Sequence, residues 1–453
     1  MPDSVLAPVE LSDALVAEMH AALAADDWVL ASALAEPLHA ADLADLLERL
    51  EPDERAALVA ALGPGLTADA LAHLDEFVRD QVMMALGPAA TGEAVAQLEL
   101  TDAVDVLSDL DEAGQAAILA ALPLPERAAI EQGLAFPEYS AGRLMQRALV
   151  AIPDYWTVGQ AVDYLRAQPE LPDEFYDIFL IDPRFRAVGA VPLSRVLRSR
   201  RAVPLSALKL KELRTFPPEA DQEEVARAFH RYGLVTAPVV AGDGRLLGQI
   251  TIDDVVDVID EEAEDDILKL GGVSEDDTYV PATRTSLRRM PWLVVNLFTA
   301  MAGASVIAHF EDTLARLVAL AALMPMVAGM AGNAGTQALT VTVRALAAGE
   351  ITAANGWRAW RKELAVGMLN GLGFLVLGTA FALAWERELS IALVFGGALL
   401  VNLVAAAAIG TAVPMVLQRL GQDPAVGSSV FLTPVTDAIG FFVFLGLASL
   451  FLL

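Results

Sequence analysis

The distribution of charge along the chain constrains its fold more than any other feature. Residues 291–453 carry seven Lys or Arg and eight Asp or Glu, whereas residues 1–290 carry 23 basic and 52 acidic side chains. The net charges of the two parts are therefore −1 and −29. The back part holds long runs that are apolar all round, with Gly and Ala scattered through them, which is typical of closely packed membrane helices. The sequence predicts an acidic front part joined to a membrane domain.

Five segments of the back part reach the roughly 20 apolar residues that a bilayer crossing requires. We expect spans at about 291–310, 316–340, 363–384, 389–416 and 427–452. Basic residues collect before the first span, between the second and third, and between the fourth and fifth, so the positive-inside rule places these loops in the cytoplasm. The N-terminus is then cytoplasmic and the C-terminus outside, in a plasma or inner membrane. Residues 1–10 are acidic and lack an apolar run, so we expect no cleavable signal peptide.

Composition excludes several classes of function. The chain has 0 Cys, which rules out disulfides, thiol catalysis and Cys-ligated zinc. A net charge of −30 argues against a general nucleic-acid or anionic-membrane binder. There is no P-loop, nucleophile elbow or HExxH motif, so we do not expect an enzyme. No two of the 5 His have metal-ligand spacing, so any metal must be held by oxygens, as Mg2+, Ca2+ or Mn2+ would be.

Polar residues inside the spans are candidates for function, because they are costly in hydrocarbon. Asp437 lies deep in the fifth span and has no basic neighbour in sequence. Asn333 lies in a second-span run with three glycines and Pro325, which predicts either a broken helix lining a cavity or a close helix-packing face. Asn296, Asn370 and Asn402 are interpreted mainly as interhelical hydrogen bonders.

The front part begins with a leucine repeat. Leucine recurs every twelve residues, at Leu38, Leu50, Leu62, Leu74, Leu86, Leu98, Leu110, Leu122 and Leu134. Each unit predicts a short amphipathic helix followed by a tight turn. Such units bury their apolar faces only by stacking, so residues 1–137 are expected to form an acidic α-solenoid.

Two copies of an α/β module follow, at 138–203 and 204–260. In the second copy a helix at 221–232 precedes two strands, and the run from Gly248 to Asp254 resembles the signature of CBS domains. The first copy has Ser194 and Arg195 where an acid would begin the next helix, so it resembles a degenerate CBS domain. CBS domains pair and often bind adenine nucleotides, which makes Asp253 or Asp254 a candidate for ATP.

An acidic connector, residues 261–290, joins these modules to the first span. Nine acids lie within fourteen residues around its start, with no Lys or Arg among them: Asp253, Asp254, Asp257, Asp260, Glu261, Glu262, Glu264, Asp265 and Asp266. Carboxylates at i, i+3 and i+4 repel one another on a helix. The segment is either a solvated acidic helix or, as we favour, a helix whose packing needs a divalent cation.

Acidic helical repeats, a CBS pair, an acidic connector and five spans, in this order, resemble the MgtE family of magnesium channels. The most specific motifs are the runs at 329–337, 343–346, 420–425 and 434–437. The resemblance implies a homodimer with a pore between the membrane domains. It implies that Asp437 holds a hydrated Mg2+ with Asn333 nearby, and that Asp423 lies near the cytoplasmic mouth. It also implies regulatory Mg2+ sites, with candidates at Asp102, Asp105, Asp221, Glu223, Asp254, Asp257, Glu262, Asp265 and Asp266.

Elementary chemistry agrees with this interpretation. Mg2+ keeps most of its waters and binds through one or two carboxylates, which one Asp per protomer would supply across a two-fold axis. Cation binding to the repelling acids would favour a closed state, so we expect a self-limiting Mg2+ influx channel. Co2+ and Mn2+ remain possible substitutes. Two alternatives stay open, a proton-coupled transporter that uses Asp437 and a non-transporting membrane-anchored CBS sensor.

Overall fold

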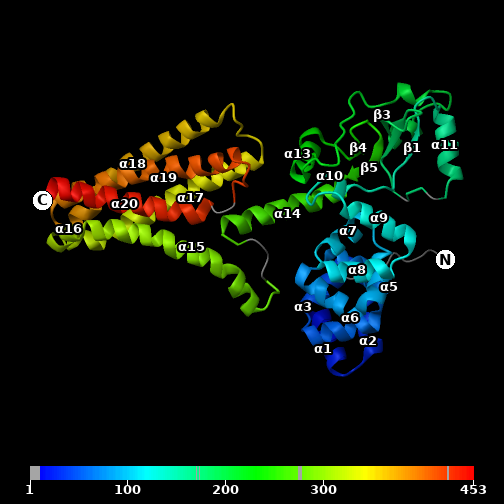
Figure 1. Ribbon diagram of the computed structural model, residues 1–453, viewed down its shortest axis with the longest axis horizontal. Helices are drawn as coiled ribbons and strands as arrows, with labels where there is room; N and C mark the ends of the chain where they lie inside the picture. The colour runs from blue at the N-terminus through cyan, green and yellow to red at the C-terminus, as the bar shows by residue number, and fades with distance from the viewer. Residues whose placement is uncertain (1–10, 170, 173, 274–277, 426–427) are drawn as a thin grey trace. The chain divides into compact units, whose positions relative to one another are not determined.

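The structure is a computed structural model that describes residues 11–169, 171–172, 174–273, 278–425 and 428–453 (Figure 1). It divides into two compact units, residues 1–261 and 262–453. The first unit holds a helical domain and an α/β pair of modules, and the second holds the long apolar helices.

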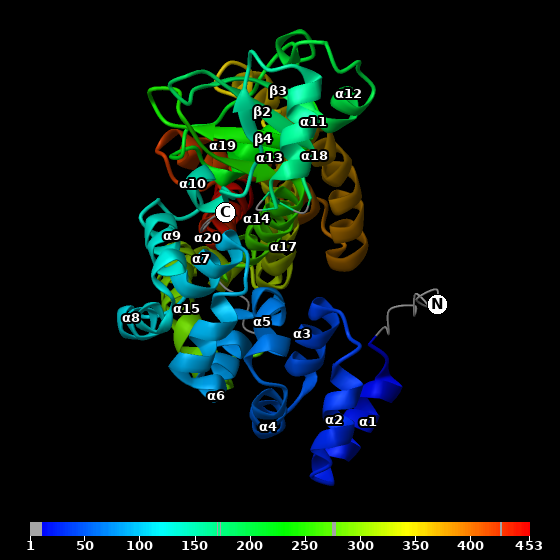
Figure 2. The same ribbon diagram turned by 90° about the vertical axis from the view of Figure 1, so that its right-hand side faces the viewer.

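The helical domain is a stack of short helices (Figure 2). Its members are α1 (Asp13–Ala24), α2 (Trp28–Ala35), α3 (Ala40–Arg49), α4 (Pro52–Leu62), α5 (Pro64–His73), α6 (Glu76–Val95), α7 (Leu100–Ser108), α8 (Glu112–Ala121) and α9 (Leu124–Leu134). All nine leucines of the repeat belong to one core or pack against it, and Leu50, Leu74 and Leu122 are buried at helix C-caps. The predicted solenoid is confirmed, because the helices pack mainly on those one or two places away along the chain. The leucines of the repeat lie in or against the core between them.

The α/β part contains two modules. The first consists of α10 (Ala141–Leu144), β1 (Ala151–Pro153), α11 (Val158–Ala167), β2 (Asp177–Ile181), β3 (Ala187–Pro192), α12 (Leu193–Leu197) and the 3-10 turn η1 (Leu205–Ala207). The second consists of α13 (Gln222–Tyr232), β4 (Thr236–Val240), β5 (Leu246–Thr251) and the start of α14 (Ile252–Leu270). β2 pairs with β1 in parallel and with β3 antiparallel, and β4 pairs antiparallel with β5.

The two modules are joined by polar contacts. The Thr236 hydroxyl donates to Asp177 Oδ2 at 2.6 Å, and burial raises the pKa of Asp177. In the first module Pro192 precedes the short α12, and Arg195 on that helix donates to the Leu208 carbonyl at 3.0 Å. Arg195 therefore holds the linker between the modules, where an acid was expected from the CBS pattern.

The connector begins as the last helix of the second module. α14 is continuous from Ile252 to Leu270, so the boundary predicted at residue 260 falls inside a helix. α15 begins at Ala282, nine residues before the predicted first span.

The membrane unit consists of α15 (Ala282–His309), the short α16 (Glu311–Arg316), α17 (Ala319–Ala347), α18 (Gly356–Glu386), α19 (Leu389–Arg419) and α20 (Ser428–Leu452). Within the described ranges, four helices are long and apolar enough to cross a membrane, namely α15, α18, α19 and α20. α17 has the length but is less apolar, since Pro325, three glycines and several polar side chains interrupt its apolar sequence. We assign it as the fifth membrane helix because its apolar face packs on α19 and α20.

Glycines set the close packing of this unit. A Cβ at Gly367 of α18 would lie 2.7 Å from the Ala407 Cβ of α19, and one at Gly371 would lie 3.0 Å from the Leu400 carbonyl oxygen. The first distance is shorter than real Cβ atoms show, and the second is tighter than most of their contacts. Small residues therefore let α18 approach the central α19, as is common where membrane helices pack.

Candidate functional site

α17 exposes a polar stripe along one face. Asn333, Thr336, Gln337 and Thr340 are exposed at helical spacing, whereas Val327, Ala331 and Leu339 on the other face are buried. Polar groups that face hydrocarbon lose their hydrogen bonds to water, so such a face in a membrane helix must meet water or another protein surface.

In the glycine-rich run, Gly335 serves close packing, whereas a Cβ at Gly329 or Gly332 would meet no atom within 4 Å. α17 is an unbroken helix through residues 329–335, and its glycines there have negative φ angles. The broken-helix alternative is therefore wrong. A Cβ at Gly335 would lie 3.2 Å from Leu432 Cδ1 of α20, and one at Gly410 of α19 would overlap the Gly335 carbonyl oxygen. Three helices thus meet at Gly335, next to the polar stripe.

Asp437 lies on α20, half-buried, one turn after the exposed Thr433. One turn further along, Gly440 makes room for Asn402 of α19, whose Nδ2 donates to the Val327 carbonyl of α17 at 3.1 Å. This buried amide ties α17, α19 and α20 together beside the carboxylate. The predicted interhelical role is confirmed for Asn402. It is wrong within one protomer for Asn296 and Asn370, which are exposed and make no side-chain hydrogen bond to a described residue.

A second group of acids surrounds Lys269 near the end of α14. Lys269 Nζ lies 2.5 Å from Asp265 Oδ2 and 2.8 Å from Asp423 Oδ2, and the other Asp423 oxygen accepts from the Ala425 N–H at 2.8 Å. Burial and then the nearby Asp423 raise the pKa of Asp266. The paired carboxylates raise the pKa of Lys269, although burial opposes them. An ammonium therefore occupies the place between acids where a cation was expected.

The sequence analysis did not identify Lys269, because the acidic run on which it rests ends at Asp266. The residue lies one turn beyond Asp265, so an i, i+4 ion pair was readable from the sequence. Its pairing with Asp423, 154 positions later, was not.

A third group lies in the first unit, where α7 meets α14. Gln146 Nε2 donates to Glu99 Oε2 at 3.2 Å and to Asp254 Oδ1 at 3.0 Å. Asp254 also accepts from the Thr251 hydroxyl at 2.6 Å and from the Thr251 N–H at 3.1 Å. No sequence signal marked Gln146, which joins the helical domain to the second module through its amide.

Asp102 has the most strongly raised pKa in this third group. Burial, followed by Glu99, Asp254, Asp105 and Asp257, raises its pKa to about 7. Burial raises the pKa of Asp254 to about 6, although its hydrogen bonds oppose the shift. Repulsion of this kind is what a divalent cation would relieve.

Three other predicted metal ligands already have an arginine or a backbone N–H as a partner. Asp105 Oδ2 lies 3.5 Å from Arg79 Nη1, which makes Asp102 the better of the two candidates offered for the helical domain. Asp221 caps α13 by accepting from the Glu223 N–H at 2.9 Å, and Glu223 lies 3.9 Å from Arg227.

Three further acids lie along α14. The side chain of Asp257 is exposed overall, but the protein around its carboxyl group partly removes that group from water and raises its pKa. Glu262 is partly buried. Of the two candidates for binding a nucleotide, Asp254 already accepts hydrogen bonds from Thr251 and Gln146, whereas Asp253 is exposed at the start of the helix.

The acids of a single chain do not form a metal-binding cluster within the part of the chain that the structure describes. Among the described residues, no three His, Asp or Glu side chains are placed to hold an ion together. The acids are brought together in pairs and around Gln146 and Lys269, so any ion would need a second copy of the chain, waters or a rearrangement to complete its shell.

Comparison with known proteins gives three family matches. They are a divalent cation transporter domain at residues 324–447, an MgtE intracellular N domain at 38–139 and a CBS domain at 206–261. The chain is 31% identical over 335 residues to a magnesium transporter, MgtE, of Bacillus subtilis, covering 74% of each chain. It is 33% identical over 362 residues to the MgtE of Thermus thermophilus, covering 78% of this chain and 79% of the other.

A solved structure also resembles the front part. The cytosolic domain of the Mg2+ channel MgtE in complex with ATP matches with a TM-score of 0.50 and 27% identity, covering 54% of this chain and 99% of that one.

Proposed function

Because the chain belongs to the MgtE family of magnesium transporters, we propose that it is a channel that admits Mg2+ passively across the plasma membrane and closes when cytosolic Mg2+ binds its acids. The working unit is a homodimer, with the N-terminus in the cytoplasm and the C-terminus outside.

The polar stripe of α17 carries the pore assignment. Asn333, Thr336 and Gln337 are exposed, with no helix of the described residues over them, and Asp437 is half-buried on α20, which packs against α17. A two-fold axis along this face would cover the stripe with its own copy and pair the two Asp437 carboxylates. Two carboxylates and retained waters suit Mg2+, which dehydrates reluctantly.

The acid groups around Gln146 and Lys269 support gating by Mg2+. Asp102 and Asp254 have raised pKa values because burial, and then repulsion by neighbouring acids, disfavours their charged forms. Mg2+ that binds them only when α7 and α14 are close would shift the population toward that arrangement. Several weak sites acting together make the response to cytosolic Mg2+ steep.

Adenine nucleotide is a second ligand to test, because a solved relative of the front part contains ATP. Asp253 is the exposed acid at the start of α14, whereas Asp254 is held by Thr251 and Gln146. We expect Asp253→Asn to weaken any ATP-dependent rise in thermal stability of the full chain and Asp312→Asn, in the membrane unit, to leave it unchanged.

The pore is tested by Mg2+ uptake into liposomes that contain the full chain, without a pH gradient. Asp437→Asn should abolish uptake because it removes the charge and keeps the shape. Asp312→Asn, an exposed acid on α16, is the matched control and should conduct normally. Normal flux through Asp437→Asn would refute the pore assignment. Uptake only under a proton gradient would support coupled transport, and no flux in a well-folded protein would support the sensor alternative.

Gating is tested in the same liposomes by raising Mg2+ on the cytoplasmic face. Uptake by the wild-type protein should fall steeply. In Asp102→Asn together with Asp257→Asn, uptake should depend less steeply on cytosolic Mg2+, because the acids through which Mg2+ favours the closed state are gone. An unchanged Mg2+ dependence of this double variant would refute the role of this acid group and leave the pore assignment intact.

A further inference from the structure

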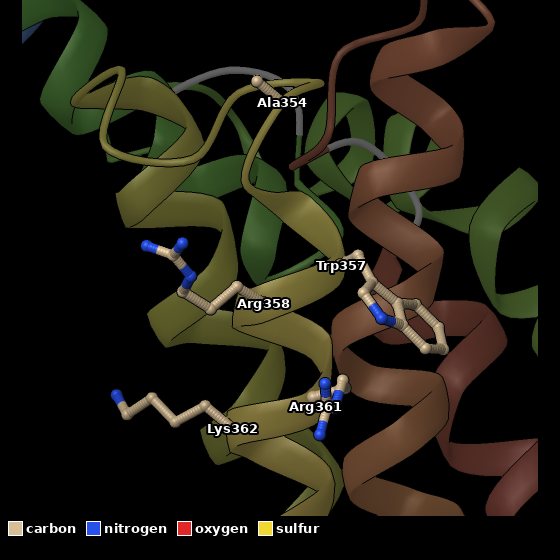
Figure 3. A pocket seen from close by; sticks show the side chains of 5 residues that line it. All are labelled: Ala354, Trp357, Arg358, Arg361 and Lys362. Carbon is tan, nitrogen blue, oxygen red and sulfur yellow. The ribbon is translucent and has the colours of Figure 1, made fainter.

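The start of α18 carries a cationic hollow on its surface. Ala354, Trp357, Arg358, Arg361 and Lys362 line a cavity of about 390 Å3 (Figure 3). In Figure 3, Arg358 and Lys362 extend to the same side of the helix one turn apart, Trp357 lies on the other side, and Arg361 lies between them. Ala354 lies in the turn before α18, and the other four residues occupy the first two turns of the helix.

The charges of this hollow are not used inside the chain. The side chains of Arg358 and Arg361 are exposed and make no hydrogen bond or ion pair with any residue that the structure describes. Lys362 lies 3.7 Å from Glu363 and is 73% exposed, so this ion pair is weak. Three cations on neighbouring turns repel one another, and an anion between them would relieve that repulsion.

The aromatic wall of the hollow is fixed in place. Trp357 stacks on Trp360, with ring centroids 5.0 Å apart and an interplanar angle of 17°. Trp360 Nε1 in turn donates to the Ala408 carbonyl of α19 at 3.1 Å. The exposed Trp357 ring is therefore held against the end of a membrane helix, the position where tryptophan commonly meets the membrane–water interface.

An apolar stripe continues from the hollow along the same helix. Leu369, Leu372 and Val376 are 70%, 47% and 69% exposed, at spacings of three and four residues. The 15 residues from Arg361 to Val376 rise about 22 Å, which is close to one leaflet of a bilayer with its headgroups. The face thus has a cationic end for a headgroup and an apolar stripe as long as a phospholipid. A free phosphate ion would use the cationic end and leave the apolar stripe unused.

We propose that this face of α18 binds an anionic phospholipid. The phosphate lies between Arg358, Arg361 and Lys362, because guanidinium groups bind phosphate oxygens in pairs. One acyl chain lies along Leu369, Leu372 and Val376. The net charge of −30 does not oppose this site, because almost all of that charge lies in residues 1–290. The inference does not rest on the proposed pore.

The test uses the full chain in nonionic detergent and counts bound lipids by native mass spectrometry. The probes are phosphatidylglycerol, phosphatidylcholine with the same acyl chains, and inorganic phosphate. The pocket variant is Arg358→Gln/Arg361→Gln. The control is Arg344→Gln/Arg419→Gln, which removes the same charge from two exposed residues at the ends of α17 and α19.

The wild-type protein should prefer phosphatidylglycerol over phosphatidylcholine. Each basic residue near an anionic headgroup contributes about fivefold to binding, so the pocket variant should lose at least about fivefold of this preference and the control less than about twofold. Added salt should weaken the preference of the wild-type protein and leave that of the pocket variant almost unchanged.

Three results would overturn the proposal. They are equal binding of both lipids by the wild-type protein, an undiminished preference in the pocket variant, and an equal loss in the control. Displacement of phosphatidylglycerol by inorganic phosphate would show a free-phosphate site instead. A pocket variant that elutes from gel filtration as the wild-type protein does confirms that folding is intact.

Discussion

Asp102→Asn should stabilise the contact between α7 and α14 when Mg2+ is absent. Burial and four neighbouring acids raise the pKa of Asp102 from 3.8 to about 7. A shift of about three units corresponds to about 4 kcal/mol as an upper bound, and partial exposure reduces it to about 1–2 kcal/mol. Asparagine removes the charge that burial and then the neighbouring acids disfavour, and it keeps the size of the side chain, so the contact gains this amount.

The gain depends on pH. A carboxyl whose pKa is raised on folding keeps its proton in the folded state after the unfolded chain has released it. Stability is therefore lost as pH rises from about 4 through 7, and the loss is complete above 7. The benefit of Asp102→Asn should be full at pH 8 and about a third as large at pH 5.

Hydrogen exchange of the full chain measures this contact locally, which a global unfolding curve of a multidomain protein does not. Protection of the amides in α7 should rise about 5- to 30-fold in Asp102→Asn at pH 8 without Mg2+. Asp105→Asn is the control on the same helix. Its carboxylate pairs with Arg79 and also repels Asp102, so its loss removes an attraction together with a smaller repulsion, and protection should rise less than in Asp102→Asn. Lower protection in Asp102→Asn, or an equal gain at pH 5 and pH 8, would refute the reasoning.

The remaining predictions concern single contacts. Lys269→Gln leaves the carboxylates beside it without their ammonium, so Mg2+ should raise the melting temperature of this variant more than that of the wild-type protein, and an equal shift would contradict the bridging role. Gly410→Ala should destabilise the membrane unit by about 1–3 kcal/mol, because its Cβ overlaps a backbone carbonyl of α17, whereas Gly397→Ala on the same helix meets no atom within 4 Å and should be neutral or stabilising in thermal unfolding. Asp177→Ala should lower the free energy of unfolding by about 1–3 kcal/mol because Thr236 loses its acceptor, and Asp177→Asn should restore most of it; equal losses would exclude the hydrogen bond as the cause.

The order of elements was readable from the sequence because each is set by local periodicity. The twelve-residue leucine repeat predicts the solenoid, and its leucines form or flank one core. The second module has the helix and the two strands that its sequence predicts, and the helix begins one residue after the predicted start. The long apolar segments correspond to α15, α17, α18, α19 and α20.

Contacts between residues far apart in the sequence could not be predicted from local patterns. Lys269 and Asp423 are 154 positions apart, and Gln146 and Asp254 are 108 apart. Asn333 and Asp437 were identified by polarity alone, yet only packing shows that the stripe containing Asn333 is left open while Gly335 is covered.

The sequence by itself determined the class of fold, the acidic front part, the membrane helices and the residue types suited to Mg2+, because charge and hydrophobic period act through local partition between water and hydrocarbon. The tertiary structure decided which acids repel one another, which pair with Lys269 or accept a hydrogen bond from Gln146, and which face of α17 stays exposed among the described residues. The physical reason is that electrostatic energies depend on distance and burial, and both are set by long-range packing.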